Sequence, residues 1–273
     1  MNFGLQVSHA FQSTIIHLNF SPAEVDAVYF PQLNVIGDIT SSIRELTKAV
    51  KVNANWDFSY YKKIKQEIEG HLGKYFQDER FPILPQRLVY ILRDILNGED
   101  IITLDNGVYK IWFARNYKCY QPNTLLLDNA LASMGAGLPS AMMVNLLYPD
   151  RKVVAVCGDG GFMMNSQELE TAVRLNLNLT VIILNDSAYG MIKWKQQDMG
   201  FENFGLEYKN PDFIKYADSY GANGYRAGSD REFRQILSHC LESKGVHVID
   251  LPVDYSLNHS ILNVLIKEKT SEL

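Results

Sequence analysis

The stretch Gly158-Asp159-Gly160-Gly161 directly follows the run Lys152–Cys157, which is apolar after its first residue, and this combination decides the fold. A second aliphatic run, Thr180–Leu184, is followed at once by Asn185 and Asp186. Both runs are rich in β-branched residues, which predicts two buried strands of a parallel sheet. Each acidic residue then follows the carboxyl end of a strand, where ligands bind in open α/β sheets.

The two acidic side chains, Asp159 and Asp186, suit a divalent cation that bridges to a phosphate. Magnesium prefers oxygen ligands and commonly shares them between one or two carboxylates and ligand phosphates. Two carboxylates about 4 Å apart repel each other by about 4 kcal/mol at an effective dielectric of 20, so without a cation we expect mobility or partial protonation. Gly160 and Gly161 would let backbone N–H groups approach phosphate oxygens, and we expect a helix over residues 165–175 whose N-terminus faces the same anion.

A dinucleotide-binding G-x-G-x-x-G motif is the main competing interpretation. Starting from Gly158, that motif needs a third glycine where this chain has Met163, and the carboxylate of Asp159 would repel a pyrophosphate unless a metal intervened. A second glycine cluster at 135–137 has Ser140 at the corresponding third position. Taken alone, residues 158–160 could equally be a turn after a strand, but the second acid favours a metal site.

These residues resemble the signature of thiamine-diphosphate enzymes, which begins with Gly-Asp-Gly and usually closes with Asn-Asn. Here the closing pair is Asn185-Asp186, which keeps an oxygen ligand. Further segments are similar to the large subunit of acetolactate synthases, and more to the flavin-independent type than to the flavin-containing one. They are residues 133–139, 158–172, 188–192, 210–222 and 251–255. The resemblance covers residues 82–255 and implies the C-terminal portion of such an enzyme.

The resemblance implies a cofactor, thiamine diphosphate with Mg²⁺, and a set of residues that bind it. The metal would be held by the carboxylates of Asp159 and Asp186 and by the backbone carbonyl of Ala188. Backbone groups of Gly160, Gly161 and Tyr189 would hold the diphosphate. Met134 would support the bent cofactor, the carbonyl of Ala132 would accept from its amino group, and Met191 and Ile192 would line the substrate pocket. The full implied set is Ala132, Met134, Gly158, Asp159, Gly160, Gly161, Asp186, Ala188, Tyr189, Gly190, Met191 and Ile192.

Some of these residues have a plainer explanation. Apolar side chains such as Met134, Met191 and Ile192 are more often ordinary core than cofactor supports. Tyr109 and Trp112 fall in what we expect to be a loop near the diphosphate, and the histidine found there in the flavin-containing type is absent. We therefore assign no side-chain role in that loop.

Composition excludes several other classes of protein. The 273 residues are 47% hydrophobic and 21% charged with a net charge of −5, so there is no basic excess to attract nucleic acid or anionic lipid. The three cysteines lack metal spacing, and their odd count argues against a disulfide framework. The six histidines show no paired ligand spacing. We find no signal peptide and no apolar run of about 20 residues, and we expect a cytoplasmic protein.

The order of expected elements predicts a doubly wound parallel α/β sheet, the thiamine-diphosphate-binding fold, over residues 82–273. Residues 51–81 are expected to form a linker helix, and residues 1–50 resemble the C-terminal remnant of a central α/β domain. In that remnant we expect strands at 14–18 and 33–38, a turn or helix start at 21–25, and a helix at 41–50. In the main domain we expect strands at 101–104, 152–157, 180–184 and 246–251, and helices from Pro85, over 129–147 and 165–175, from Met191 and Asp212, and over 261–269.

By resemblance, the expected reaction condenses two pyruvates to 2-acetolactate and CO₂, a step of branched-chain amino acid biosynthesis or of acetoin formation. The family assembles as a homodimer or tetramer through its cofactor domains. Its activating glutamate belongs to a separate pyrimidine-binding domain of which we find no sign here, since Glu67, Glu168 and Glu170 are explained as helix surface residues. The isolated chain should then be inactive. The alternatives are another pyruvate-using enzyme, an oxidase or decarboxylase, or a non-catalytic cofactor-binding module.

Overall fold

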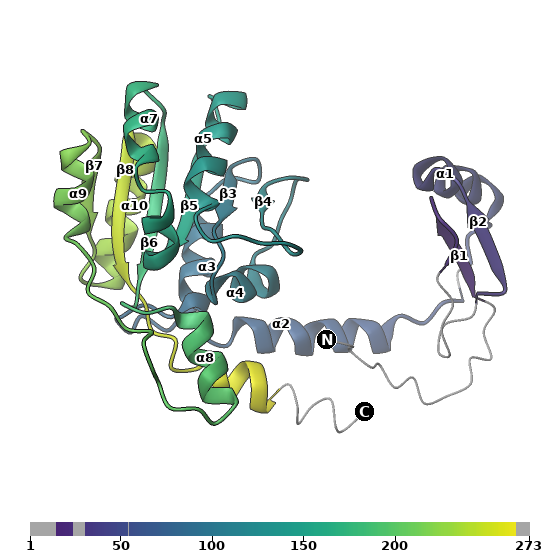
Figure 1. Cartoon of the computed structure of the whole chain (residues 1–273). Coiled ribbons are helices and arrows are strands. Elements are labelled where there is room, and N and C mark those ends of the chain that lie inside the picture. The colour runs from purple at the N-terminus through teal and green to yellow at the C-terminus, as the bar shows by residue number, and fades with distance from the viewer. Residues whose placement is uncertain (1–14, 24–30, 54, 266–273) are drawn as a thin grey trace. The chain divides into compact units, whose positions relative to one another are not determined.

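A computed structural model describes residues 15–23, 31–53 and 55–265 (Figure 1). The chain divides into two compact units, residues 1–63 and 64–273. The predicted turn or helix start at 21–25 and the predicted helix at 261–269 lie partly outside the described residues.

The first unit contains a parallel pair of short strands and a helix in its described part. β1 (Ile16–Asn19) pairs with β2 (Leu33–Ile36), and α1 (Ile39–Ala49) follows after Asp38. The Asp38 side chain accepts a hydrogen bond of 2.7 Å from the backbone N–H of Ser41, which satisfies one of the free donors of the helix start. None of the α1 residues is buried, in agreement with the small core expected from the sequence. α2 (Ser59–Gly73) lies within the predicted linker, and the division between the units falls inside it.

The second unit is built on a six-stranded sheet in which every pair is parallel, in the order β4-β3-β5-β6-β8-β7. Its strands are β3 (Ile101–Leu104), β4 (Leu125–Leu126), β5 (Val153–Gly158), β6 (Leu179–Asn185), β7 (Asn223–Arg226) and β8 (Val246–Pro252). All residues of β3, and all of β5 and β6 except the last, are buried, as expected for parallel strands covered on both faces.

Alternation along the strands divides the core into two layers, one on each face of the sheet. In β5, Val154 and Val156 belong to one cluster, whereas Val153, Ala155 and Cys157 belong to the other. The first cluster includes residues of α3 (Pro85–Ile95), α4 (Tyr109–Asn116) and α10 (Asp230–Glu242). The second includes residues of α5 (Gly137–Leu147), α6 (Asp159–Met164), α7 (Glu168–Arg174) and α9 (Phe213–Ser219). Helices on both faces of a parallel sheet confirm the predicted doubly wound fold (Figure 1).

Several local predictions were wrong. The helix expected over 129–147 begins only at Gly137, because Gly135 takes a left-handed conformation with φ of 92°. The helix expected over 165–175 is replaced by α6 and α7, and the loop expected around Tyr109 is helix α4. The helix expected from Met191 is α8 (Gly190–Asp198). Where a helix over 261–269 was expected, the last described element is a π-helix, Ser260–Leu265.

β4, β7 and α10 were not predicted, although α10 carries a start signal. The Ser229 side chain accepts from the N–H of Glu232, which is the S-x-x-E pattern of a helix N-terminus.

No helix within the described residues combines the length and apolar character needed to cross a membrane.

A buried ion pair links α3 to α10, and its loss should destabilise the second unit. Arg87 donates to both carboxylate oxygens of Asp230, at 2.7 and 2.9 Å, and both side chains are almost fully buried. We expect Asp230→Ala to lower the free energy of unfolding by about 3 kcal/mol, because the buried Arg87 guanidinium then keeps only the exposed Glu79 as an ion-pair partner. Asp94→Ala, which breaks the exposed pair with Arg234, should cost less than about 1 kcal/mol. Urea denaturation of the two variants gives both values, and equal losses would contradict this prediction.

Candidate functional site

Three neighbouring strands of the sheet, β3, β5 and β6, each end next to an aspartate. Asp105 follows β3, Asp159 follows β5 and Asp186 follows β6. Because the strands are parallel neighbours, the three acids lie at the same edge of the sheet. The site is therefore created by the topology, which brings together residues far apart in the sequence.

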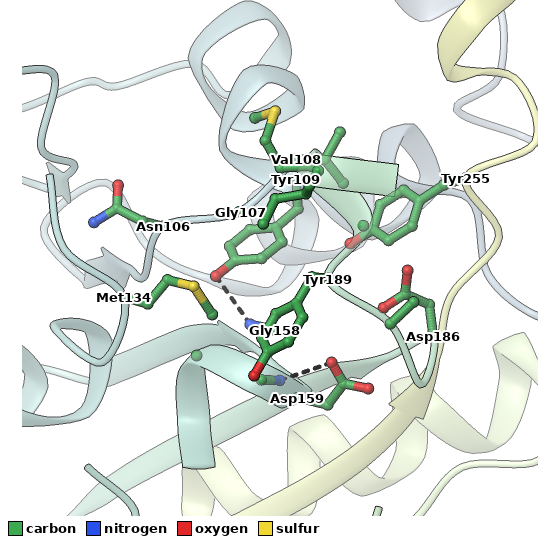
Figure 2. Close-up of a pocket in the computed structure, with 16 residues that line it drawn as sticks. Asn106, Gly107, Val108, Tyr109, Met134, Gly158, Asp159, Asp186, Tyr189 and Tyr255 are labelled. Carbon is green, nitrogen blue, oxygen red and sulfur yellow. Dashed lines mark hydrogen bonds between the residues drawn. The ribbon is translucent and has the colours of Figure 1, made fainter. Parts of the chain in front are cut away.

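A pocket opens at this edge, and it contains all of the predicted cofactor-binding residues except Ala132 (Figure 2). The space within it, counted together with its open mouth, is about 430 Å³. Ala132 is exposed and does not line it. The lining also includes residues for which the sequence suggested no role, namely Asn106, Gly107, Val108, Tyr109 and Tyr255.

The carboxylate of Asp159 is the most constrained group of the pocket, with only 1% of the residue exposed. Its Oδ1 accepts hydrogen bonds from the N–H of Gly160 and the hydroxyl of Tyr208, both at 2.7 Å. Its Oδ2 accepts from the N–H of Ser187 at 2.8 Å and from the side-chain amide of Asn210 at 2.6 Å. Four donors therefore compensate this buried charge.

Asp186 lies on a sharp turn that follows β6. Ser187 adopts a left-handed conformation with φ of 51°, which turns the chain between Asp186 and Ala188. A Cβ at Gly190 would lie 2.9 Å from Asp186 Oδ2, so a side chain there would displace the carboxylate. Burial, and then the negative charge of Asp159, raise the pKa of Asp186 to about 7, partly offset by the positive charge of Lys193. This shift is the expected result of two carboxylates that share a site.

The oxygen atoms of the site fit a hard divalent cation. One atom, the Tyr208 hydroxyl oxygen, lies 2.7 Å from Asp159 Oδ1 and 3.2 Å from the Ala188 carbonyl oxygen, so these two oxygens converge on a single point. Asp186 lines the same pocket. No group of three His, Cys, Asp or Glu side chains suited to a metal occurs among the described residues. A cation here would therefore need further oxygens from a ligand, as Mg²⁺ bound to a phosphate does.

The backbone donors of the site come mainly from the start of α6. We expected the helix over 165–175 to face the anion, whereas α6 begins at Asp159 itself and places Gly160 and Gly161 in its first turn. The first N–H groups of a helix have no partner within the helix. The N–H of Gly160 already donates to Asp159 Oδ1 at 2.7 Å, and the N–H of Tyr189 donates to the Leu206 carbonyl at 3.1 Å, so both are engaged.

Asp105 was not among the predicted site residues, and it fixes the segment that carries Met134. Its fully buried carboxylate accepts from the N–H of Gly135 at 2.9 and 3.0 Å and from the N–H of Asn106 at 2.6 Å. Burial raises the pKa of Asp105, and these backbone N–H groups oppose that shift. A Cβ at Gly161 would lie 2.9 Å from Asp105 Oδ2, so the carboxylate also lies directly against α6.

Two further residues escaped the sequence interpretation. The buried hydroxyl of Tyr109 accepts from the N–H of Gly158 at 2.9 Å, which connects α4 to the end of β5 (Figure 2). Trp112, one turn further along α4, does not line the pocket and donates to Asn258 at 2.8 Å. A signal for Asp105 did exist, because it follows a strand just as Asp159 and Asp186 do.

Comparison with known proteins agrees with this geometry. Residues 105–251, more than half of the chain, match the family model described as "Thiamine pyrophosphate enzyme, C-terminal TPP binding domain". The chain belongs to the thiamine pyrophosphate enzyme family. The matched range begins at Asp105 and contains Asp159, Asp186 and Tyr208.

Curated relatives bear out the resemblance to acetolactate synthases. The chain is 35% identical over 269 residues to the acetolactate synthase of Bacillus subtilis, covering 95% of this chain and 46% of that protein. It is 31% identical to the catabolic acetolactate synthase of Raoultella terrigena, covering 93% of this chain and 46% of the relative. A probable acetolactate synthase large subunit of Methanococcus aeolicus is also 31% identical, with shares of 91% and 44%. The chain spans a little under half the length of these relatives.

The raised pKa of Asp186 predicts a pH dependence of stability in the protein without added cation. The usual carboxyl value is 3.8, so between about pH 4 and pH 7 the folded chain holds a proton that the unfolded chain has lost. This group should therefore stabilise the fold at low pH and lose that effect as the pH rises to about 7. Asp186→Asn should remove this part of the decline. Melting temperatures of both proteins from pH 4 to 8 in a chelating buffer test this, and parallel pH profiles would contradict it.

Proposed function

We propose that this chain is the diphosphate-binding half of an acetolactate synthase, which condenses two pyruvates to 2-acetolactate and CO₂ with thiamine diphosphate and Mg²⁺. The observation that carries the proposal is the convergence of Asp159 Oδ1 and the Ala188 carbonyl on one point of a pocket that Asp186 also lines. The relatives named acetolactate synthase support the choice of reaction.

In this proposal the protein binds and orients, and the cofactor supplies the carbanion chemistry at the keto carbon of pyruvate. Asp159, Asp186 and the Ala188 carbonyl would hold Mg²⁺, and the N–H group of Gly161 would donate to the diphosphate. Four apolar side chains line the rest of the pocket and would keep water from the reacting carbon. They are Val108, Met134, Met191 and Ile192.

The same proposal makes this chain half of a site. No glutamate lines the pocket in the described part of the chain, whereas the family's activating group is a glutamate of the pyrimidine-binding domain. We therefore propose that residues 82–273 form the cofactor domain, that residue ranges 1–50 and 51–81 are a central-domain remnant and a linker, and that the isolated chain is inactive.

We also propose a cytoplasmic protein that assembles as a homodimer or tetramer. Large apolar side chains exposed near the end of α5 support such an assembly. They are Met143, Leu146, Leu147 and Tyr148.

Cofactor binding tests the first part of the proposal. Calorimetry should show that thiamine diphosphate binds only when Mg²⁺ is present. Asp159→Ala should weaken binding at least about 100-fold, because the loss of groups that merely support metal ligands already costs 10- to 100-fold. Glu170→Ala, which removes an exposed partner of Arg174, is the matched control and should bind like the wild type. Unchanged binding by the Asp159 variant would rule out the proposed metal site.

Catalysis tests the second part. The isolated chain should give no measurable acetolactate from pyruvate, and adding a pyrimidine-binding domain from a related synthase should restore production. Robust product from the isolated chain would contradict the half-site proposal. Acetaldehyde as the main product would point to a decarboxylase, and acetyl phosphate with hydrogen peroxide to an oxidase. Cofactor binding without any product after complementation would indicate a non-catalytic module.

A further inference from the structure

Tyr208 reaches the metal-ligand atoms from a segment that carries no recognisable motif. Ala188 and Glu207 form an antiparallel bridge, and the N–H of Tyr208 donates to the Ser187 carbonyl at 3.1 Å. This short pairing lays residues 206–208 against the turn after β6. The ring centroid of Tyr208 lies 5.0 Å from that of Tyr189, which lines the pocket. The hydroxyl is thereby held at a defined place.

That hydroxyl contacts two of the three proposed metal ligands at once. It donates to Asp159 Oδ1 at 2.7 Å and lies 3.2 Å from the Ala188 carbonyl oxygen. A tyrosine hydroxyl has one proton to donate, so the two oxygens share it. The two oxygens therefore converge on one positively polarised hydrogen, and a metal cation bound to both would occupy the same position.

The carboxylate of Asp159 has no acceptor position left for a cation. A carboxylate offers about four lone-pair sites, and here four protein donors use them. Two of these donors are backbone N–H groups fixed by α6 and by the turn after β6, and the third, Asn210, is also held by Asn185 at 2.9 Å. Tyr208 is the one donor of the four that also contacts Ala188. A metal that binds Asp159 and Ala188 together would therefore replace this hydroxyl.

We propose that the Tyr208 hydroxyl is a stand-in for the cation, which keeps the Asp159 and Ala188 oxygens together and leaves when Mg²⁺ binds. This inference rests on the proposed function, because it assigns the residue with which Mg²⁺ competes at that site. Tyr208 is a positioning residue, since it acts through the ligand atoms and takes no part in the reaction. Its hydroxyl stabilises the fold before the metal arrives and lowers the affinity for the metal.

Removing the hydroxyl gives opposite effects on stability and on metal binding. Tyr208→Phe should lower the melting temperature in chelating buffer, because two buried oxygens lose a donor. It should also tighten Mg²⁺ binding, measured by calorimetry at saturating thiamine diphosphate, by about tenfold, the lower end of what a hydrogen bond to a charged group is worth. Tyr208→Leu also lacks the hydroxyl and serves if the phenylalanine variant fails to fold. Tyr60→Phe, at an exposed residue of α2, is the matched control and should change neither quantity.

The outcomes separate this inference from the proposed function. If wild-type protein binds Mg²⁺ with thiamine diphosphate and the variant binds it more tightly, the inference holds. If wild-type protein binds but the variant binds equally or more weakly, the hydroxyl is no competitor and only the inference fails. If wild-type protein does not bind, the proposed function fails, and the inference fails with it.

Discussion

The buried carboxylate of Asp159 connects three segments of the chain that surround the site. Moving an ionised group out of water is costly unless donors surround it, and this one receives four hydrogen bonds. The donors come from the start of α6, from the turn after β6, and from the segment 206–210. Loss of any of them would leave part of the charge uncompensated, so the same interactions that make Asp159 tolerable also fix the walls of the pocket.

Asp105, the aspartate that follows β3, also fixes a segment beside the site. Its carboxylate accepts from Asn106 and Gly135, and so ties the segment that carries Met134 to the end of β3. Parallel topology places this second buried acid next to β5, in contact with the glycine at the start of α6. The pocket is therefore preorganised by two buried carboxylates, each of which fixes a segment beside it.

The sequence could predict the parts of this site that depend on local signals. Aliphatic, β-branched runs indicated β5 and β6, and the acids that follow them indicated Asp159 and Asp186. Tyr208 and Asn210 could not be found in this way, because the bridge between Ala188 and Glu207 that positions them joins distant residues. The helix expected over 129–147 failed for another reason: its apolar pattern is continuous, but the backbone at Gly135 is left-handed and cannot be helical.

Asp159 and Asp186 meet the same two opposing demands in different ways. A carboxylate that is to bind a cation must stay close to a second negative charge and must also survive burial before the cation arrives. Asp159 meets both demands through donors, whereas burial and the charge of Asp159 raise the pKa of Asp186 to about 7, so that a proton can neutralise it near neutral pH. The hydrogen bonds to Asp159 and the proton on Asp186 thus reduce the repulsion between the two carboxylates. In the proposed metal site each would occupy a position that the cation needs, so stability of the fold without metal would come at the expense of metal affinity.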